Sequence, residues 1–183
     1  MALTNLGSFK EVGTQVFWLY GLSGAGKSTL GSAVAEMLNE SNKPTIFLDG
    51  DILRLGVCQD LGFSPEGRLE NVRRTAELAK LLRGQGFTVI AALMTPRENM
   101  RQMARSIIGD EFFKEVFVKC DYATCASRDT KGLYAKAALG NLFQFPGKDF
   151  VFEKPIKPDL VLDTVNVSIQ ACVNSLMNKF KLF

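Results

Sequence analysis

The run from Gly21 to Ser28 reads Gly-Leu-Ser-Gly-Ala-Gly-Lys-Ser and fits the spacing Gly-x-x-x-x-Gly-Lys-Ser/Thr. Glycines allow successive backbone N–H groups to curve around phosphate oxygens, and Lys27 places a cation beside them. The hydroxyl of Ser28 is the type of group that such loops use as a magnesium ligand. We therefore expect ATP and Mg²⁺ at Gly21, Leu22, Ser23, Gly24, Ala25, Gly26, Lys27, Ser28 and Thr29.

Two carboxylates, Asp49 and Asp51, follow an apolar run and are separated by one glycine. Beside a magnesium nucleotide, one carboxylate could accept the proton of an attacking hydroxyl while the other orients that hydroxyl or holds a magnesium-bound water. A solvated turn has the same composition. Arg54 follows Asp51 by about one helical turn and is placed to face a phosphate of an acceptor. These residues predict phosphoryl transfer, with Lys27, Asp49 and Asp51 as catalytic residues.

Short apolar runs that alternate with helical patterns must position these groups. Strands are predicted at 15–20, 45–48, 88–93, 115–118 and 160–162, and apolar stripes of helical period lie within 72–82, 100–107 and 169–180. This alternation predicts an α/β fold, a three-layer nucleoside-kinase-like P-loop domain with a mostly parallel sheet and ligands beyond the carboxyl ends of its strands. Ser64-Pro65-Glu66 predicts a helix start, and Thr95-Pro96-Arg97-Glu98 predicts a capping box.

Composition bounds the remaining possibilities. A chain of 183 residues, 46% of them hydrophobic, suits one domain over residues 1–183, and a net charge of only +3 gives no reason to expect nucleic acid as a partner. Histidine is absent, which excludes histidine-based triads and metal sites, and four irregularly spaced cysteines favour free buried thiols over disulfides or zinc. Since no apolar run reaches the length of a bilayer, we expect a cytoplasmic protein without membrane contact.

Longer motifs extend well beyond the phosphate loop. Their forms GLSGxGKST, LDGDxxR, LGFSxxxRxENxRR, RDxKGLYxKAxxG and FxGxDxxxExP stand here at 21–29, 48–54, 61–74, 128–140 and 145–155. In this order they resemble the adenylylsulfate kinases (APS kinases), and the resemblance runs from about Phe17 to Pro158. Several ordered motifs are far more specific than the phosphate loop, which many unrelated NTPases share.

The resemblance implies transfer of the γ-phosphoryl group of ATP to the ribose 3′-hydroxyl of adenosine 5′-phosphosulfate, with Mg²⁺, in a homodimer that binds small-molecule nucleotides. It also implies a lid at about 128–150, in which Arg128 is a further catalytic residue and closes over the phosphoryl group together with Lys131. The residues implied to bind the acceptor are Asp51, Arg54, Phe63, Arg68, Asn71, Thr95, Lys131 and Phe145.

Four positions depart from the family pattern. Gly67 stands in place of an acid, Glu98 in place of a cation, Phe143 in place of a lysine or arginine, and Pro146 in place of a threonine. Loss of cations predicts a weaker site for a doubly anionic acceptor. The alternatives are therefore a kinase for the ribose hydroxyl of another 5′-substituted nucleotide, such as a cytidine diphosphate derivative, or a non-catalytic nucleotide-binding module. Thr95 is expected to act as a helix cap rather than a phosphorylated intermediate.

Overall fold

The computed structural model describes residues 13–139, 147, 149 and 151–183. Five parallel strands form one sheet in the order β2-β3-β1-β4-β5. The strands are β1 (Val16–Tyr20), β2 (Thr45–Asp49), β3 (Thr88–Leu93), β4 (Phe113–Lys119) and β5 (Leu160–Asp163). The helices are α1 (Lys27–Glu40), α2 (Gly50–Leu53), α3 (Pro65–Gly84), α4 (Glu98–Ile108), α5 (Tyr122–Arg128), α6 (Leu133–Ala138) and α7 (Ile169–Lys179). The predicted α/β fold with a parallel sheet is confirmed.

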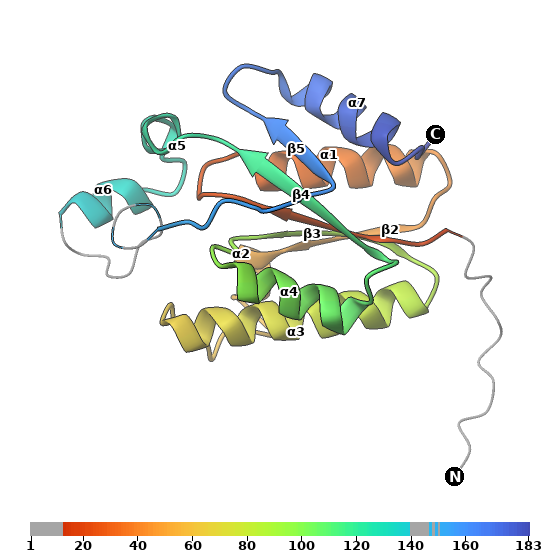
Figure 1. The fold of residues 1–183 in the computed structure, drawn as a ribbon, viewed down its shortest axis with the longest axis horizontal. Coiled ribbons are helices and arrows are strands. Elements are labelled where there is room, and N and C mark those ends of the chain that lie inside the picture. The colour runs from red at the N-terminus through yellow and green to blue at the C-terminus, as the bar shows by residue number, and fades with distance from the viewer. Residues whose placement is uncertain (1–12, 140–146, 148, 150) are drawn as a thin grey trace, which may run out of the picture.

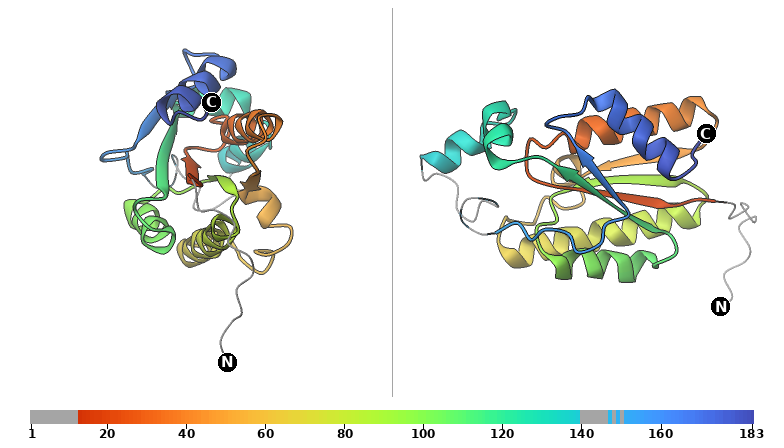
Figure 2. Two further views of the ribbon diagram at one scale, coloured as in Figure 1. Left: turned by 90° about the vertical axis from the view of Figure 1, so that its right-hand side faces the viewer. Right: turned by 45° about the horizontal axis from the view of Figure 1, so that its top comes forward.

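Helices cover both faces of the sheet, as Figures 1 and 2 show: α1 and α7 lie on one face, and α3 and α4 on the other. Each face has its own apolar cluster. Phe17 and Leu19 of β1 pack with α1 and α7, whereas Val16, Trp18 and Tyr20 pack with α3 and α4. Because β1 is central, all five of its residues are buried, which explains the unbroken apolar run in the sequence.

Parallel strands bring their carboxyl ends to the same edge of the sheet. The phosphate loop follows β1 there, the Asp-Gly-Asp run closes β2 and opens α2, and Met94 follows β3. The segments after β4 and β5 reach the same edge and lead into α5 and α7 (Figure 1). Residues that are far apart in the chain thus converge where the sequence predicted a ligand.

Only one of the two predicted helix caps is present. The Ser64 hydroxyl accepts a hydrogen bond from the Gly67 amide at 3.1 Å, as expected for a cap at the start of α3. The prediction of a capping box at Thr95 is wrong, because α4 begins at Glu98 and the Thr95 hydroxyl accepts a buried hydrogen bond from Trp18 Nε1 at 2.9 Å. The carboxylate of the distant Glu153 accepts from the Glu98 amide at 2.6 Å instead.

The four cysteines are free and buried, as predicted. Among the helices of the described residues, none combines the length and the apolar character that spanning a bilayer requires.

Candidate active site

The phosphate side of the site, which we define as Gly21–Thr29, is built mainly from backbone. Gly24 and Gly26 have φ angles of 75° and 93°, which lie in the left-handed region that favours glycine. Gly21 is needed for a different reason, because a side chain there would collide with the Val118 carbonyl oxygen. Helix α1 starts at Lys27 with no side-chain cap and no acidic residue in its first turn. Its N-terminal amides and partial positive charge are therefore available to an anion.

Lys27 lies within this loop and donates a hydrogen bond from Nζ to the Leu22 carbonyl oxygen at 2.7 Å. Burial, and secondly the cation of Lys131, lower the pKa of Lys27 to about 8, while Asp51 opposes the shift. Desolvation disfavours the charged form of a lysine, and an arriving polyanion favours it. The amine is thus held ready beside the loop for a phosphate ligand.

Ser28 and Asp49 stand side by side, with 2.5 Å between Ser28 Oγ and Asp49 Oδ2. The other oxygen, Asp49 Oδ1, accepts from the Asp51 amide at 2.8 Å and so caps the short helix α2. A hydroxyl and a carboxylate oxygen are ligands that Mg²⁺ prefers, and this ion commonly completes its shell with water and substrate phosphates. No group of three or more His, Cys, Asp or Glu side chains suited to a metal occurs among the described residues. The Ser28–Asp49 pair therefore fits a magnesium nucleotide rather than an all-protein metal cage.

Asp51 has a different environment from Asp49. Its side chain is 60% exposed, lines a cavity that also borders the phosphate loop, and forms an ion pair with Lys131. Asp49 is held by Ser28 and by the start of α2, and it is absent from the cavity lining. The two carboxylates, which the sequence could not tell apart, therefore have separate partners.

A cavity of about 660 Å³ joins the two halves of the site, and its size lies in the range of small-molecule sites. It brings together most of the residues that the sequence singled out. The predicted residues in its lining are Ser23, Gly24, Gly26, Lys27, Ser28, Thr29, Asp51, Arg54, Phe63, Arg68, Asn71, Arg128 and Lys131.

The acceptor side, which we define as Arg54, Phe63, Arg68 and Asn71, is built from side chains. The Phe63 ring is 53% exposed, and the guanidinium carbons of Arg54 and Arg68 lie 4.5 Å and 5.5 Å from its centroid. Burial, and secondly the Arg54 cation, lower the pKa of Arg68 to about 10, so both groups stay charged at neutral pH. An aromatic face beside two cations suits a base and an anionic group of one ligand.

Asn71 adds a polar group to the wall of the cavity. It is only 6% exposed, and its buried Oδ1 has no hydrogen-bond partner among the described residues. A buried amide oxygen without a partner costs free energy, which a ligand that donates a hydrogen bond there would recover.

The structure does not bring every predicted residue to the cavity. Thr95 is fully buried, accepts a hydrogen bond from Trp18 and does not line the cavity. Phe145, together with the departures Phe143 and Pro146, lies outside the described residues, as does most of the predicted lid beyond Leu139.

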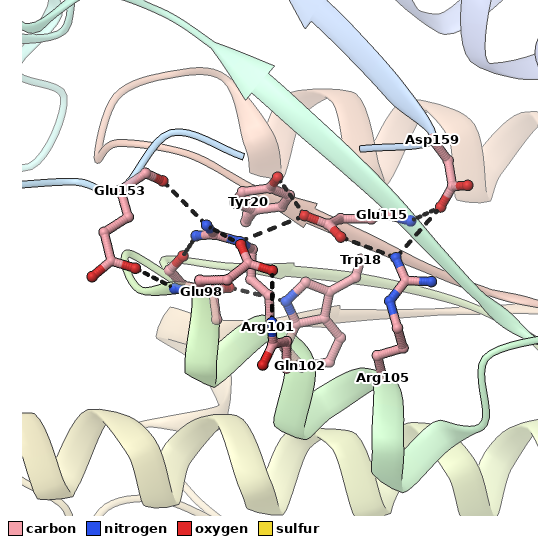
Figure 3. Close-up of polar contacts among 10 residues, drawn as sticks. Trp18, Tyr20, Glu98, Arg101, Gln102, Arg105, Glu115, Glu153 and Asp159 are labelled. Atoms are coloured by element: carbon pink, nitrogen blue, oxygen red, sulfur yellow. Dashed lines mark hydrogen bonds and ion pairs between the residues drawn. The ribbon is translucent and has the colours of Figure 1, made fainter. Parts of the chain in front are cut away.

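Glu98 also lies elsewhere, within the polar network drawn in Figure 3. Its carboxylate accepts from Arg101 Nη2 at 2.6 Å, and Arg101, 1% exposed, also forms an ion pair with Glu115 at 3.5 Å. The network includes the Tyr20 hydroxyl, which donates to Glu115 at 2.6 Å. The Glu98 charge is therefore neutralised outside the cavity, and the expected weakening of the acceptor site through Glu98 has no structural support.

Sequence reasoning missed one wall of the cavity, formed after β5 by Thr164, Val167 and Ile169. The Thr164 hydroxyl donates to the Ala25 carbonyl oxygen at 2.8 Å, and Arg128 Nη2 donates to the Thr164 carbonyl oxygen at 2.7 Å. Through these two hydrogen bonds, Thr164 connects the C-terminal end of α5 to the phosphate side. The position of the segment at the carboxyl end of a parallel strand was the available signal.

Comparison with known proteins agrees with this geometry. The profile of the family described as adenylylsulphate kinase matches residues 13–163. An adenylyl-sulfate kinase from Paraburkholderia xenovorans is 48% identical over 162 residues, which cover 88% of this chain and 90% of that protein. The chain belongs to the adenylylsulfate kinase family. It is therefore a kinase, a phosphotransferase that acts on a hydroxyl group.

Two solved structures of the family extend the comparison. The Mycobacterium tuberculosis APS kinase in complex with AMPPNP and APS superposes with a TM-score of 0.89 at 37% identity, covering 92% of this chain and 98% of that chain. A hexameric APS kinase from Thiobacillus denitrificans superposes with a TM-score of 0.67 at 29% identity, covering 92% of this chain and 29% of that longer chain. The fold of this kinase is thus that of its family.

Proposed function

We propose that this kinase transfers the γ-phosphoryl group of ATP to the ribose 3′-hydroxyl of adenosine 5′-phosphosulfate and produces 3′-phosphoadenosine 5′-phosphosulfate. The observation that carries the proposal is the single cavity, in which Lys27 and Ser28 of the phosphate side face Arg54 and Phe63 of the acceptor side, with Asp51 in its lining. The M. tuberculosis relative, whose structure contains AMPPNP and APS, supports the choice of substrates.

The phosphate side binds ATP through the loop amides, the N-terminus of α1 and the Lys27 cation. The wall at Thr164, Val167, Ser168 and Ile169 combines two aliphatic side chains with two hydroxyl groups and suits the adenine of ATP. Ser28 and Asp49 hold Mg²⁺, which when bound neutralises phosphate charge. Arg128, which is bound to Thr164 and lines the same cavity, adds a cation near the phosphates.

Asp51 acts as the base that accepts the proton of the 3′-hydroxyl. It is the carboxylate that lines the cavity, and the side chain of Lys131 forms an ion pair with it. Asp49 keeps its place beside Ser28 and orients Asp51 through the start of α2. When the acceptor binds, Lys131 leaves Asp51 for an anionic group of the substrates, which frees the base and stabilises the transferred charge.

The acceptor side holds the second nucleotide. The Phe63 ring stacks on its adenine, Arg54 and Arg68 pair with its phosphosulfate, and Asn71 Oδ1 accepts a hydrogen bond from it. Thr95 acts here only through the backbone turn that follows β3. Phe145 keeps its proposed place as a second stacking ring, and the lid at about 128–150 keeps its role in excluding water.

We further propose that residues 1–183 form one domain, that it works in the cytoplasm in sulfate activation, and that its smallest assembly is a homodimer. Light scattering of the purified protein measures the assembly, and a monomer would contradict the dimer. The hexameric relative shows that larger assemblies occur in the family.

The deciding experiment is ATP-dependent phosphorylation of a panel that contains adenosine 5′-phosphosulfate, AMP and cytidine and uridine 5′-derivatives, with product mass as the readout and Lys27→Ala as the control. We expect conversion of adenosine 5′-phosphosulfate far above the other nucleotides. Preferred conversion of a cytidine derivative would overturn the substrate. ATP binding without turnover of any acceptor would favour a non-catalytic module.

A further inference from the structure

Gly67 lies in the first turn of α3 and faces the loop that carries Phe63. A Cβ built at Gly67 would lie 2.6 Å from the Gly62 carbonyl oxygen, closer than Cβ atoms occur in proteins, and 3.1 Å from the carbonyl carbon, which is a tight contact. Both obstacles are backbone atoms, which cannot rotate aside as a side chain can. Gly67 has an ordinary helical backbone without a positive φ. In this chain it is therefore the space against Gly62, and not the conformation of the helix, that favours glycine at position 67.

The loop, residues 54–64, is held in this close position by the two arginines of the acceptor side. Arg54 Nη1 donates to the carbonyl oxygens of Leu61 at 3.0 Å and Gly62 at 3.1 Å. Arg68 Nε donates to the Phe63 carbonyl oxygen at 2.9 Å. If Gly62 and Phe63 moved away from α3, the Arg68 bond would lengthen, and movement of Gly62 relative to Arg54 would stretch the Arg54 bonds. Hydrogen bonds from charged donors to neutral acceptors are worth more than ordinary ones.

A third arginine of α3 fixes the outer part of the same loop. Arg74 donates to the Val57 carbonyl oxygen at 2.9 Å and to both oxygens of Asp60 at 2.6 Å and 2.8 Å. Arg74 does not line the cavity, and its remaining contact is an ion pair with Glu70 of α3 at 3.0 Å, so it fixes the loop from outside the site. Since the loop is tied on both sides of Gly62, it cannot yield to a new side chain at position 67 without losing some of these bonds.

We propose that Gly67 is a positioning residue for the acceptor: it sets how closely residues 54–64 approach α3, and thereby where the Phe63 ring and the Arg54 guanidinium stand in the cavity. A side chain at position 67 lifts Gly62, stretches the Arg54 and Arg68 bonds and moves the aromatic platform. The phosphate side has no contact with Gly67, so ATP binding stays unchanged. This inference rests on the proposed function, because its kinetic readout is the acceptor.

The test compares Gly67→Ala with a matched glycine variant that also adds a single methyl group. A Cβ at Gly84, at the other end of α3, meets nothing within 4 Å. We expect Gly67→Ala to raise the KM for adenosine 5′-phosphosulfate at least fivefold, with the KM for ATP within twofold of wild type. Gly84→Ala should leave both constants within twofold. Amide hydrogen exchange in residues 57–63 should be faster in Gly67→Ala and unchanged in Gly84→Ala.

An unchanged acceptor KM in a folded Gly67→Ala variant, or an equal rise in both KM values, would overturn the role. Should that variant fail to fold, Arg74→Gln loosens the same loop from outside the cavity, and an acceptor KM within twofold of wild type would be equally decisive against it. The exchange measurement needs no substrate. Failure of the wild-type enzyme to phosphorylate adenosine 5′-phosphosulfate would therefore count against the proposed function and leave the Gly67 contact to be judged by exchange.

Discussion

The phosphate side and the acceptor side of one cavity are made in different ways. On the phosphate side, nine consecutive residues supply backbone amides, two glycines with positive φ and the start of a 14-residue helix. On the acceptor side, Arg54, Phe63, Arg68 and Asn71 meet because the loop of residues 54–64 is tied to α3 by hydrogen bonds from Arg68 and Arg74 and is braced internally by Arg54. A local motif thus makes the first site, whereas tertiary packing makes the second.

The two sides should therefore respond differently to substitution. The amides of the phosphate side belong to the chain itself and persist when single side chains change. The acceptor side depends on a few guanidinium contacts, several of them partly exposed, and its geometry changes when the loop moves. We therefore expect the phosphate side to keep its shape in most single variants, and acceptor affinity to change whenever the loop moves.

The largest effect should come from Asp51→Asn. If Asp51 accepts the proton of the acceptor hydroxyl, its loss should lower kcat by about 10²- to 10⁴-fold, with ATP affinity within about threefold of wild type. Asp49→Asn is the matched control, because it should instead raise the magnesium concentration needed for half-maximal rate. Steady-state kinetics at several magnesium concentrations separates the two carboxylates. An Asp51→Asn enzyme with near-normal kcat would remove Asp51 from the role of base.

The separation of the two carboxylates marks the limit of prediction from sequence. The parallel sheet, its five strands and the phosphate loop were predictable, because apolar periodicity and a nine-residue motif are local signals. The roles of Asp49 and Asp51 were not, since they depend on which one contacts Ser28 across 21 positions of sequence. The wrong prediction of a cap at Thr95 has the same cause, because Trp18, which donates a hydrogen bond to the Thr95 hydroxyl, lies 77 positions away in the sequence.

A second test uses pH on the phosphate side. Burial holds the pKa of Lys27 near 8 in the free protein, and bound phosphates favour the charged amine. Above pH 8 the protein must therefore take up a proton to bind ATP, and the dissociation constant should rise about tenfold between pH 7 and pH 9. Calorimetry in buffers of different ionisation enthalpy should detect this uptake.

Lys27→Arg is the control for that profile, because its guanidinium stays charged over the whole range. It should show a dissociation constant that hardly changes with pH, whatever its absolute value. If the ATP dissociation constant depended equally steeply on pH in both proteins, the titration would belong to another group. The KM of the wild type for the acceptor should not show the pH dependence of ATP binding.

A smaller effect is expected from Phe63→Ala on the acceptor side. Loss of one stacking face is worth about 0.5–1.5 kcal/mol, so the KM for adenosine 5′-phosphosulfate should rise roughly 2- to 13-fold. The KM for ATP should stay constant, because Phe63 does not contact the phosphate loop. Val57→Ala in the same loop is the control, since Val57 is 59% exposed and lies outside the cavity lining. Equal effects of the two variants would show that the loop tolerates neither change and that stacking contributes nothing.

The smallest expected effect is a change in thermal stability at Asn71, which we propose binds the acceptor at the expense of stability. Its Oδ1 is buried and has no hydrogen-bond partner in the part of the chain that the structure describes, which costs about 1–3 kcal/mol, and an apolar side chain of similar size removes that cost. Asn71→Leu should therefore raise the melting temperature by about 2–4 °C per kcal/mol recovered in a chain of this size, while it weakens acceptor binding. Thermal unfolding with and without adenosine 5′-phosphosulfate checks both halves, because the ligand should stabilise the wild type more than the variant. A variant that is less stable than the wild type without ligand would mean that Asn71 stabilises the fold rather than binds the acceptor. In that case the acceptor side would not lose stability for the sake of binding, and the contrast with the phosphate side would fail.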